Sequence, residues 1–358
     1  MLPNANIAGG TFIRRFIHDP EAIAPEEYSS FLSEVLVNAE WRSELIALLS
    51  AASARPFSAY VATRFVEAII GATPRVALPE AESAVNIVGT GGGRATFNIS
   101  TTAAFVAAAA GARVLKSGSP AYNSRSGAID VLRSLGVLFE AKPDHVAECL
   151  SRYNLAFAPP SAYPPVLRRM AITLMPLNLR DIGAIVNMVG PMLCPYKVGA
   201  QLIGVASESM LRPYADALNA CGVPRAWVVH AEIGMDELCS LSRNHVLVVG
   251  AQESATLNPV ELGCVSRDPD ALNGGSPQDN ARIVEAILAG KGSIEQQETV
   301  ALNAAATLVL AGREPGYAAA YRRCLDVLKR GEALGTLASL RQYAQEQVSR
   351  KAQTAVMS

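Results

Sequence analysis

Residues 84–116 read AVNIVGTGGGRATFNISTTAAFVAAAAGARVLK, and this stretch decides the fold. A short apolar run at residues 84–88 has β character and ends in a glycine-rich turn at residues 89–93. A helical stretch at residues 100–111 and a second strand-like run at residues 113–116 follow. This order predicts a βαβ unit with a glycine-rich first turn, which is typical of a parallel α/β sheet.

The alternation of strand and helix continues along the chain. Further strand-like runs lie at residues 156–158, 201–206, 226–230 and 246–249, and helical patterns separate most of them. The chain is helical up to about residue 71 and again from residue 279 to about residue 347. We therefore expect an α/β fold: a large domain with a mostly parallel central sheet flanked by helices, and a small all-helical domain.

The composition is that of a folded chain without a strong electrostatic preference. Of its 358 residues, 50% are hydrophobic and 18% are charged, which excludes a disordered protein. The formal net charge of −1 gives no general attraction to nucleic acid or to an anionic membrane. Six cysteines without a C-x-x-C pair argue against a zinc site and against a disulfide framework. We find no signal-peptide pattern and no membrane span, so we expect a cytoplasmic protein.

The glycine-rich turn is the strongest candidate for a binding site. Its four glycines allow backbone amides to approach a bound group, and the helix that follows begins near Asn98 and Ser100. Amides at such a turn and at a helix N-terminus suit an anion such as a phosphate. The simpler interpretations are a flexible turn and a helix that Asn98 or Ser100 caps.

Two more groups of polar residues follow predicted strands. Lys116, Ser117 and Ser119 come at the end of the second strand of the βαβ unit, at the edge where α/β proteins bind ligands. Asp236 and Glu237 come just after the run at 226–230, and such a pair can hold Mg²⁺ together with substrate phosphates. The alternatives are an ordinary serine-rich loop and an exposed acidic pair.

Seven motifs in this order resemble the anthranilate phosphoribosyltransferase family, which shares its fold with pyrimidine nucleoside phosphorylases. The resemblance covers the chain from about Tyr28 to about Ala344. The motifs are Gly89-Thr90-Gly91-Gly92, Asn98-Ile99-Ser100-Thr101, Lys116 with Gly118, Ser124-Arg125-Ser126-Gly127, Asn187-Met188-Val189-Gly190-Pro191, Gly234-Met235-Asp236-Glu237 and Gly274-Gly275-Ser276-Pro277.

The resemblance implies a division of the chain and an activity. Residues 1–78, joined by about 174–198, would form the small helical domain, and residues 79–173 and 199–358 the large α/β domain. The activity would be transfer of a phosphoribosyl group from 5-phosphoribosyl 1-pyrophosphate (PRPP) to a small acceptor, with Mg²⁺, in a homodimer formed through the small domain.

The resemblance also implies which residues bind each partner. PRPP would be bound by Gly89, Thr90, Gly91, Gly92, Asn98, Ser100, Thr101, Lys116 and Ser126. Mg²⁺ would be held by Ser100, Asp236 and Glu237. The acceptor would be bound by Ser117, Gly118, Ser119, Tyr163, Asn178, Arg180 and Gly190. No residue is assigned to proton transfer.

The departures from the family concentrate on the acceptor side. The family has Lys-His-Gly-Asn where this chain has Lys-Ser-Gly-Ser at 116–119, and a histidine where this chain has Tyr163. The arginine that binds the anthranilate carboxylate aligns with Asn178, with Arg180 two residues further on. An acidic residue after the glycines is replaced by Gly93. The four acceptor-side changes, at positions 117, 119, 163 and 178, favour an aromatic or heterocyclic acceptor other than anthranilate.

Three other functions remain as alternatives. A true anthranilate phosphoribosyltransferase of tryptophan biosynthesis would need Arg180, Arg168 or Arg169 to reach the acceptor carboxylate. A non-catalytic relative that binds nucleic acid is disfavoured by the even charge balance. Phosphorolysis of nucleosides is disfavoured by Asp236 and Glu237, which suit metal-dependent pyrophosphate chemistry.

Overall fold

The computed structural model describes residues 5–118, 127–137, 142–175, 177, 182–251 and 253–356. Its centre is a seven-stranded sheet with the order β3-β2-β1-β4-β5-β6-β7. The strands are β1 (Val85–Gly89), β2 (Val114–Lys116), β3 (Leu155–Phe157), β4 (Ala200–Gly204), β5 (Ala226–Ala231), β6 (Asn244–Val249) and β7 (Ser254–Leu257). The first five strands run parallel, while β6 and β7 are antiparallel to their neighbours, so the predicted mostly parallel sheet is confirmed.

The strand order changes direction at β1. From β1 the chain goes to β2 and β3 on one side, then returns to β4 on the other side and continues outward. Such a switch point leaves a crevice beyond the carboxyl ends of the two central strands, where open α/β sheets bind ligands. The glycine-rich turn lies at this place because it directly follows β1.

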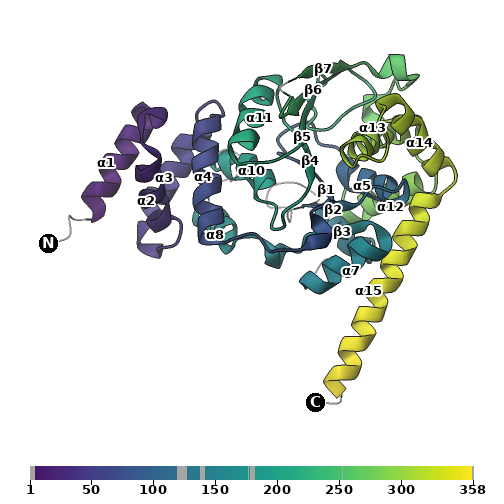
Figure 1. Cartoon of the computed structure of the whole chain (residues 1–358), viewed down its shortest axis with the longest axis horizontal. Helices are drawn as coiled ribbons and strands as arrows, with labels where there is room; N and C mark the ends of the chain where they lie inside the picture. Colours follow the sequence, from purple (N-terminus) through teal and green to yellow (C-terminus); the bar gives the residue numbers. More distant parts are fainter. Residues whose placement is uncertain are drawn as a thin grey trace.

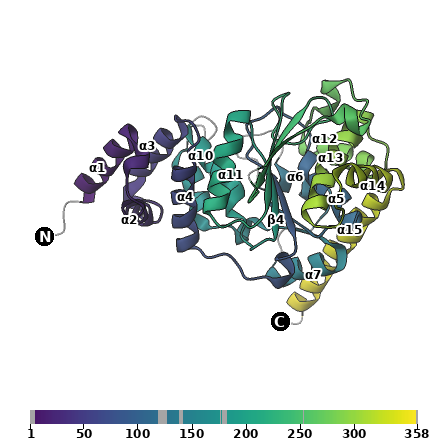
Figure 2. The same cartoon turned by 45° about the horizontal axis from the view of Figure 1, so that its top comes forward.

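Helices cover both faces of the sheet (Figures 1 and 2). One core cluster lies between the sheet and the helices α5 (Ile99–Ala109), α6 (Ala128–Ser134), α7 (Pro143–Tyr153), α12 (Pro277–Leu288), α13 (Ile294–Leu310), α14 (Tyr317–Lys329) and α15 (Glu332–Val356). The second cluster joins the opposite face to α1 (Ala5–His18), α2 (Pro25–Val35), α3 (Arg42–Ser53), α4 (Ala59–Ala72), α8 (Pro165–Thr173), α10 (Ala184–Val189) and α11 (Leu211–Ala220).

The N-terminal helices form one end of the molecule, and α10 and α11 lie between them and the sheet (Figure 2). Residues of α8 and α10, which follow α4 by more than 90 positions in the sequence, pack into the same cluster as α1–α4. The division of the chain into two domains at the expected residues stays a prediction.

The alanine-rich helix α5 is buried along nearly its whole length, as the sequence predicts. Its small side chains let it pack closely against α13, α14 and α15 on one side and β1 and β2 on the other. No helix in the described part of the chain is long and apolar enough to cross a membrane. All six cysteines are free thiols, and five of them are buried.

The long helix α15 is anchored to α7 by a buried tyrosine. The Tyr343 hydroxyl donates to Glu148 Oε2 at 2.7 Å, and Arg152 donates to Glu148 Oε1 at 2.7 Å. These two hydrogen bonds hold the pKa of Glu148 below its ordinary value, and the bond from Tyr343 has the larger effect. A lowered folded-state pKa adds stability above the ordinary value of 4.5, and this stability is lost as the pH falls through the folded-state value.

We therefore expect Tyr343→Phe to lower the free energy of unfolding by about 1 kcal/mol at pH 7, with the difference shrinking as the pH falls below about 4.5. Tyr317→Phe is the control, because the Tyr317 hydroxyl donates to the Leu302 carbonyl, which does not titrate. Urea unfolding from pH 3.5 to 7 measures both variants. Equal pH profiles for the two would contradict the role of the Glu148 carboxylate.

Candidate active site

The glycine-rich turn leaves β1 at Gly89 and is held against the next strand. Thr90 donates its backbone N–H to the Gly204 carbonyl at 2.9 Å. Gly91 and Gly92 have φ values of 69° and 88°, in the left-handed region that glycine adopts without strain. Both are exposed, so their backbone lies at the mouth of the crevice.

Asp236 reaches this turn from the other side of the switch point. Strand β5 ends at Ala231 and the chain reverses in a tight turn, in which Ala231 donates its N–H to the Met235 carbonyl at 3.1 Å. The Asp236 carboxylate then accepts the backbone N–H of Gly91 at 2.8 Å. The acidic pair and the glycine turn, 145 residues apart, therefore form one site.

This approach depends on glycines. Gly89 and Gly204 are in register at the carboxyl ends of β1 and β4. A Cβ at Gly89 would collide with the Asp236 carboxylate, and a Cβ at Gly204 would collide with the Asp236 carbonyl. The two missing side chains thus create the space that Asp236 fills.

The glycine at position 93, where the family has an acid, is tied to the same turn. A Cβ at Gly93 would lie 2.9 Å from Asp236 Oδ1 and 3.1 Å from the Gly234 carbonyl oxygen. The neighbouring Arg94 donates its backbone N–H to that carbonyl at 2.9 Å. A side chain at position 93 would push the turn that carries Gly234 and Asp236 outward. Glycine at position 93 therefore allows Asp236 to lie where it does.

Lys116 supplies the positive charge of the site. It is only 4% exposed, at the end of β2, and its Nζ donates to the Ser117 carbonyl at 2.7 Å. Burial lowers its pKa to about 8, and the charges of Glu237 and Asp236 oppose that shift. Lys116 and the acidic pair are therefore close enough to interact, as the sequence-based hypothesis requires.

The two carboxylates fit a divalent cation. Burial raises the pKa of Glu237 well above its ordinary value, the neighbouring Asp236 raises it further, and Glu237 Oε2 is buried without a hydrogen-bond partner. Burial also raises the pKa of Asp236, while the Gly91 amide opposes that shift. Within the described ranges no group of three or more His, Cys, Asp or Glu side chains could hold a metal. Two carboxylates completed by substrate phosphates suit Mg²⁺, which rarely uses an all-protein cage.

The N-terminus of α5 borders the glycine turn. Asn98 stands at the N-cap position, but its side chain caps no backbone amide of the helix. Its Oδ1 instead accepts Asn280 Nδ2 at 2.9 Å. Thr101 Oγ1 is buried without a partner, and Ser100 is partly buried at the second helical position. The capping interpretation of Asn98 is therefore wrong, whereas its contact with PRPP stays a prediction.

The structure brings some predicted acceptor residues together. Burial raises the pKa of the Tyr163 phenol, and the nearby polar groups of Ser117 and Gly118 oppose that shift, although Ser117 Oγ is buried without a hydrogen-bond partner. The Ser117 backbone N–H donates to Asn86 Oδ1 at 3.0 Å, which fixes the end of β2. Gly190 begins a short helical turn, and a Cβ there would meet open space. Ser119, Ser126, Asn178 and Arg180 lie outside the described residues.

Arg169, one of the arginines that could bind an acceptor carboxylate, is hydrogen-bonded to backbone carbonyls instead. Arg169 donates to the carbonyls of Leu36 and Asn38, which joins α8 to the connection between α2 and α3. Arg168 on the same helix is exposed. In this arrangement Arg169 is a structural link between helices.

The sequence analysis missed several residues of the site. Asn86, Arg94 and Asn280 fix its loops, and no local motif marks them. His230 is buried with Nδ1 3.0 Å from the Val205 carbonyl, and its charge would lower the pKa of Asp236. Unlike the other three, His230 is indicated by the sequence, because it lies at the end of a strand-like run near the crevice, where a structural histidine is favoured over a base.

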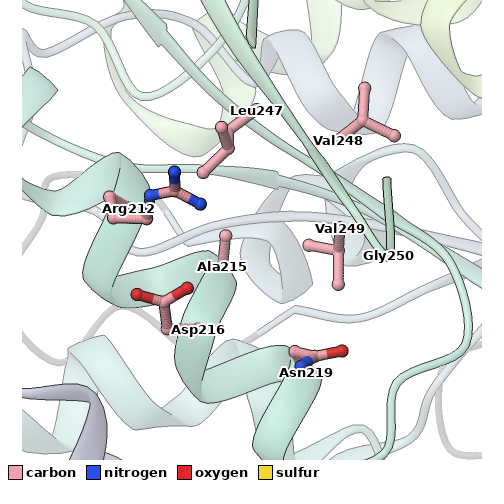
Figure 3. A pocket seen from close by; sticks show the side chains of 8 residues that line it. All are labelled: Arg212, Ala215, Asp216, Asn219, Leu247, Val248, Val249 and Gly250. Carbon is pink, nitrogen blue, oxygen red and sulfur yellow. The ribbon is translucent and has the colours of Figure 1, made fainter. Parts of the chain in front are cut away.

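A separate shallow pocket lies between α11 and β6 (Figure 3). Arg212, Asp216 and Asn219 line it from the helix, and residues 247–250 line it from the strand and the following turn. It leaves about 10 Å³ for solvent, about the space that one water molecule needs. This pocket is too small to bind a substrate.

Comparisons with known proteins identify the architecture. Residues 81–334 match the model of the glycosyl transferase family, a/b domain. A protein of Methylobacterium radiotolerans named anthranilate phosphoribosyltransferase is 38% identical over 321 residues, which cover 89% of this chain and 86% of that protein. A protein of the same name from Shewanella denitrificans is 38% identical over 275 residues, 76% of this chain and 75% of that one.

Solved structures agree with these relatives. Anthranilate phosphoribosyltransferase from Thermus thermophilus superimposes with a TM-score of 0.82 at 32% identity, covering 93% of this chain and 99% of that one. The enzyme from Saccharomyces cerevisiae, in complex with PRPP and Mg, has the same fold with a TM-score of 0.82 at 22% identity, over 95% of this chain and 98% of that one. The chain is a phosphoribosyltransferase and belongs to the anthranilate phosphoribosyltransferase family.

Proposed function

We propose that this chain transfers the phosphoribosyl group of PRPP to the nitrogen of a small aromatic acceptor, releases pyrophosphate, and uses Mg²⁺. The observation that carries the proposal is the hydrogen bond between Gly91 N–H and Asp236, with Lys116 beside the acidic pair. It unites amides, a cation and two carboxylates at the switch point of the sheet. These are the groups that a pyrophosphate with a bound metal requires.

The reaction explains why such groups are needed. Breaking the C–O bond at the anomeric carbon leaves positive charge on the ribose and adds negative charge to the departing pyrophosphate. In the proposal, Lys116 and the amides of the glycine turn stabilise that negative charge. Asp236 and Glu237 would hold Mg²⁺, which supplies further positive charge to the leaving group.

We propose anthranilate as the first acceptor to test. Support comes from the relatives at 38% identity, which are named anthranilate phosphoribosyltransferase. The second candidate is an aromatic or heterocyclic acceptor other than anthranilate. It is supported by Ser117 and Tyr163, whose hydroxyl groups replace the family's histidines, and by the engagement of Arg169 with α2 and α3. Hydroxyl groups in place of the histidines suit an aromatic amine that lacks a carboxylate.

The donor half of the site is tested by calorimetric binding of PRPP. We expect Mg²⁺ to strengthen binding, and Glu237→Gln and Asp236→Asn each to weaken Mg²⁺-dependent binding about ten- to a hundred-fold, since each removes a charged metal ligand. Glu232→Gln is the matched control, because Glu232 lies just after β5 but its carboxylate contacts His245 at the surface. Equal PRPP affinity with and without Mg²⁺ would contradict the proposed metal site.

The acceptor is tested by pyrophosphate release with anthranilate and with aniline-type amines that lack the carboxylate. If anthranilate is the acceptor, kcat/KM for anthranilate exceeds that for the uncharged amines by about tenfold or more, as expected for a bound carboxylate. The second candidate predicts the reverse order. It also predicts that Tyr163→His shifts the preference toward anthranilate, with Tyr317→His, outside the site, as the control for the substitution itself.

We also propose that the protein is a cytoplasmic homodimer formed through its N-terminal helical end. Exposed apolar side chains that a second copy could cover support this: Val37, Ile172, Met175 and Leu177. Arg42 and Arg169 tie the end of α8 to the α2–α3 region, so these side chains belong to one part of the surface.

Sedimentation equilibrium is expected to give twice the chain mass of 37.7 kDa. Met175→Glu should shift the protein toward monomer, because a charge buried in an interface without a partner is costly. Val260→Glu is the control, since Val260 is equally exposed but lies on the short helix after β7. A monomeric wild type would overturn the dimer.

A further inference from the structure

Asn280 connects the start of α12 with the start of α5. It is 2% exposed, and its Oδ1 accepts the backbone N–H of Gly275 at 2.7 Å. Its Nδ2 donates to Asn98 Oδ1 at 2.9 Å. The two asparagines are 182 residues apart, so this bond depends on the fold and on no local motif.

The direction of donation along this chain of hydrogen bonds is fixed by the backbone N–H of Gly275. A backbone N–H can only donate, so Gly275 must face the oxygen of the Asn280 amide. The Nδ2 of Asn280 therefore faces Asn98 and requires an acceptor, which must be Asn98 Oδ1. The opposite end of the Asn98 amide is then its NH₂ group, a donor.

Asn98 departs from the usual behaviour of its position. An asparagine at an N-cap normally accepts a backbone amide of its own helix, but the side chain of Asn98 accepts none. Within the described part of the chain its Nδ2 makes no hydrogen bond, and the residue is only partly buried. The contact with Asn280 thus keeps Asn98 Oδ1 away from the helix and leaves Nδ2 as a donor beside the glycine turn.

The glycine pair before α12 holds this connection in place. A Cβ at Gly274 would lie 2.6 Å from the Thr96 carbonyl oxygen and 2.9 Å from the Phe97 nitrogen. The loop that carries Gly275 therefore packs directly on the backbone that leads into Asn98. Ser276 caps α12 by accepting the Asp279 N–H at 3.2 Å, which fixes the first turn of the helix that bears Asn280.

We propose that Asn280 is a positioning residue: it orients the Asn98 amide so that Nδ2 donates to a phosphate or pyrophosphate oxygen of the donor. This inference rests on the proposed function and assigns a task to the Gly274-Gly275-Ser276-Pro277 segment, which the sequence left without one. An amide held the other way round would present its oxygen to the anion and repel it.

Reversal of the polarity provides the test. In Asn280→Asp one carboxylate oxygen still accepts Gly275 N–H, while the other requires a donor, so the Asn98 amide turns over. We expect PRPP and pyrophosphate to bind roughly ten- to a hundred-fold more weakly by calorimetry in Mg²⁺. Asn273→Asp is the matched control, because it adds the same charge at an exposed position near the loop without touching Asn98.

A double-mutant cycle separates positioning from a general structural effect. Once Asn98→Ala has removed the amide, Asn280→Asp should weaken binding by less than about twofold, because nothing is left to orient. Additive losses in the double variant would overturn the inference. If Asn280→Asp does not fold, Asn280→Ala replaces it in the same cycle, and only variants that keep the wild-type melting temperature within a few degrees are compared.

The test also distinguishes this inference from the proposed function. If the wild type binds PRPP with Mg²⁺ but the losses in the cycle are additive, the proposed function stands and the role of Asn280 is overturned. A wild type that binds neither PRPP nor pyrophosphate overturns both.

Discussion

The backbone of Asp236 crosses the carboxyl ends of β1 and β4, and only glycines allow it to do so. A Cβ on Gly204 would collide with the Asp236 carbonyl, and a Cβ on Gly89 would collide with its carboxylate. The turn that carries the acidic pair is thereby seated in the crevice of the switch point. From that position Asp236 reaches Gly91 N–H, and Glu237 comes within reach of the charge of Lys116.

Among the described residues, the charges in this crevice do not balance. One buried lysine faces two largely buried carboxylates, and burial disfavours the charged form of all three, which lowers the pKa of Lys116 and raises those of Asp236 and Glu237. A phosphate alone would meet two like charges. Under the proposed function, a divalent cation would neutralise the carboxylates and attract the phosphate, so metal and donor would favour each other's binding. One amide also cannot serve two acceptors well, so a phosphate oxygen at Gly91 would displace the Asp236 carboxylate from that amide and leave it available to the metal.

The sequence predicts the parts of the fold that local patterns determine. The strands at 85–89, 114–116 and 226–231 follow from short apolar runs next to glycine or polar turns. Strand β7 is missed because it is a four-residue edge strand that is mostly exposed and has no alternating pattern. The alternative that Asn98 caps α5 fails because the capping preference is local, while the competing donor on Asn280 comes from a distant helix.

The two halves of the site differ in what they are built from, and this affects how far family membership determines function. The proposed donor half combines backbone, namely the Gly91 amide and the glycines at 89 and 204 that leave space, with the side chains of Lys116, Asp236 and Glu237 at strand ends. Changing it would disturb the sheet and the turns that support it. The proposed acceptor half depends on side chains, such as those of Ser117 and Tyr163, which lie close to each other. The shared fold therefore supports PRPP chemistry more strongly than it supports a particular acceptor, because the proposed donor half is tied to the sheet and its turns.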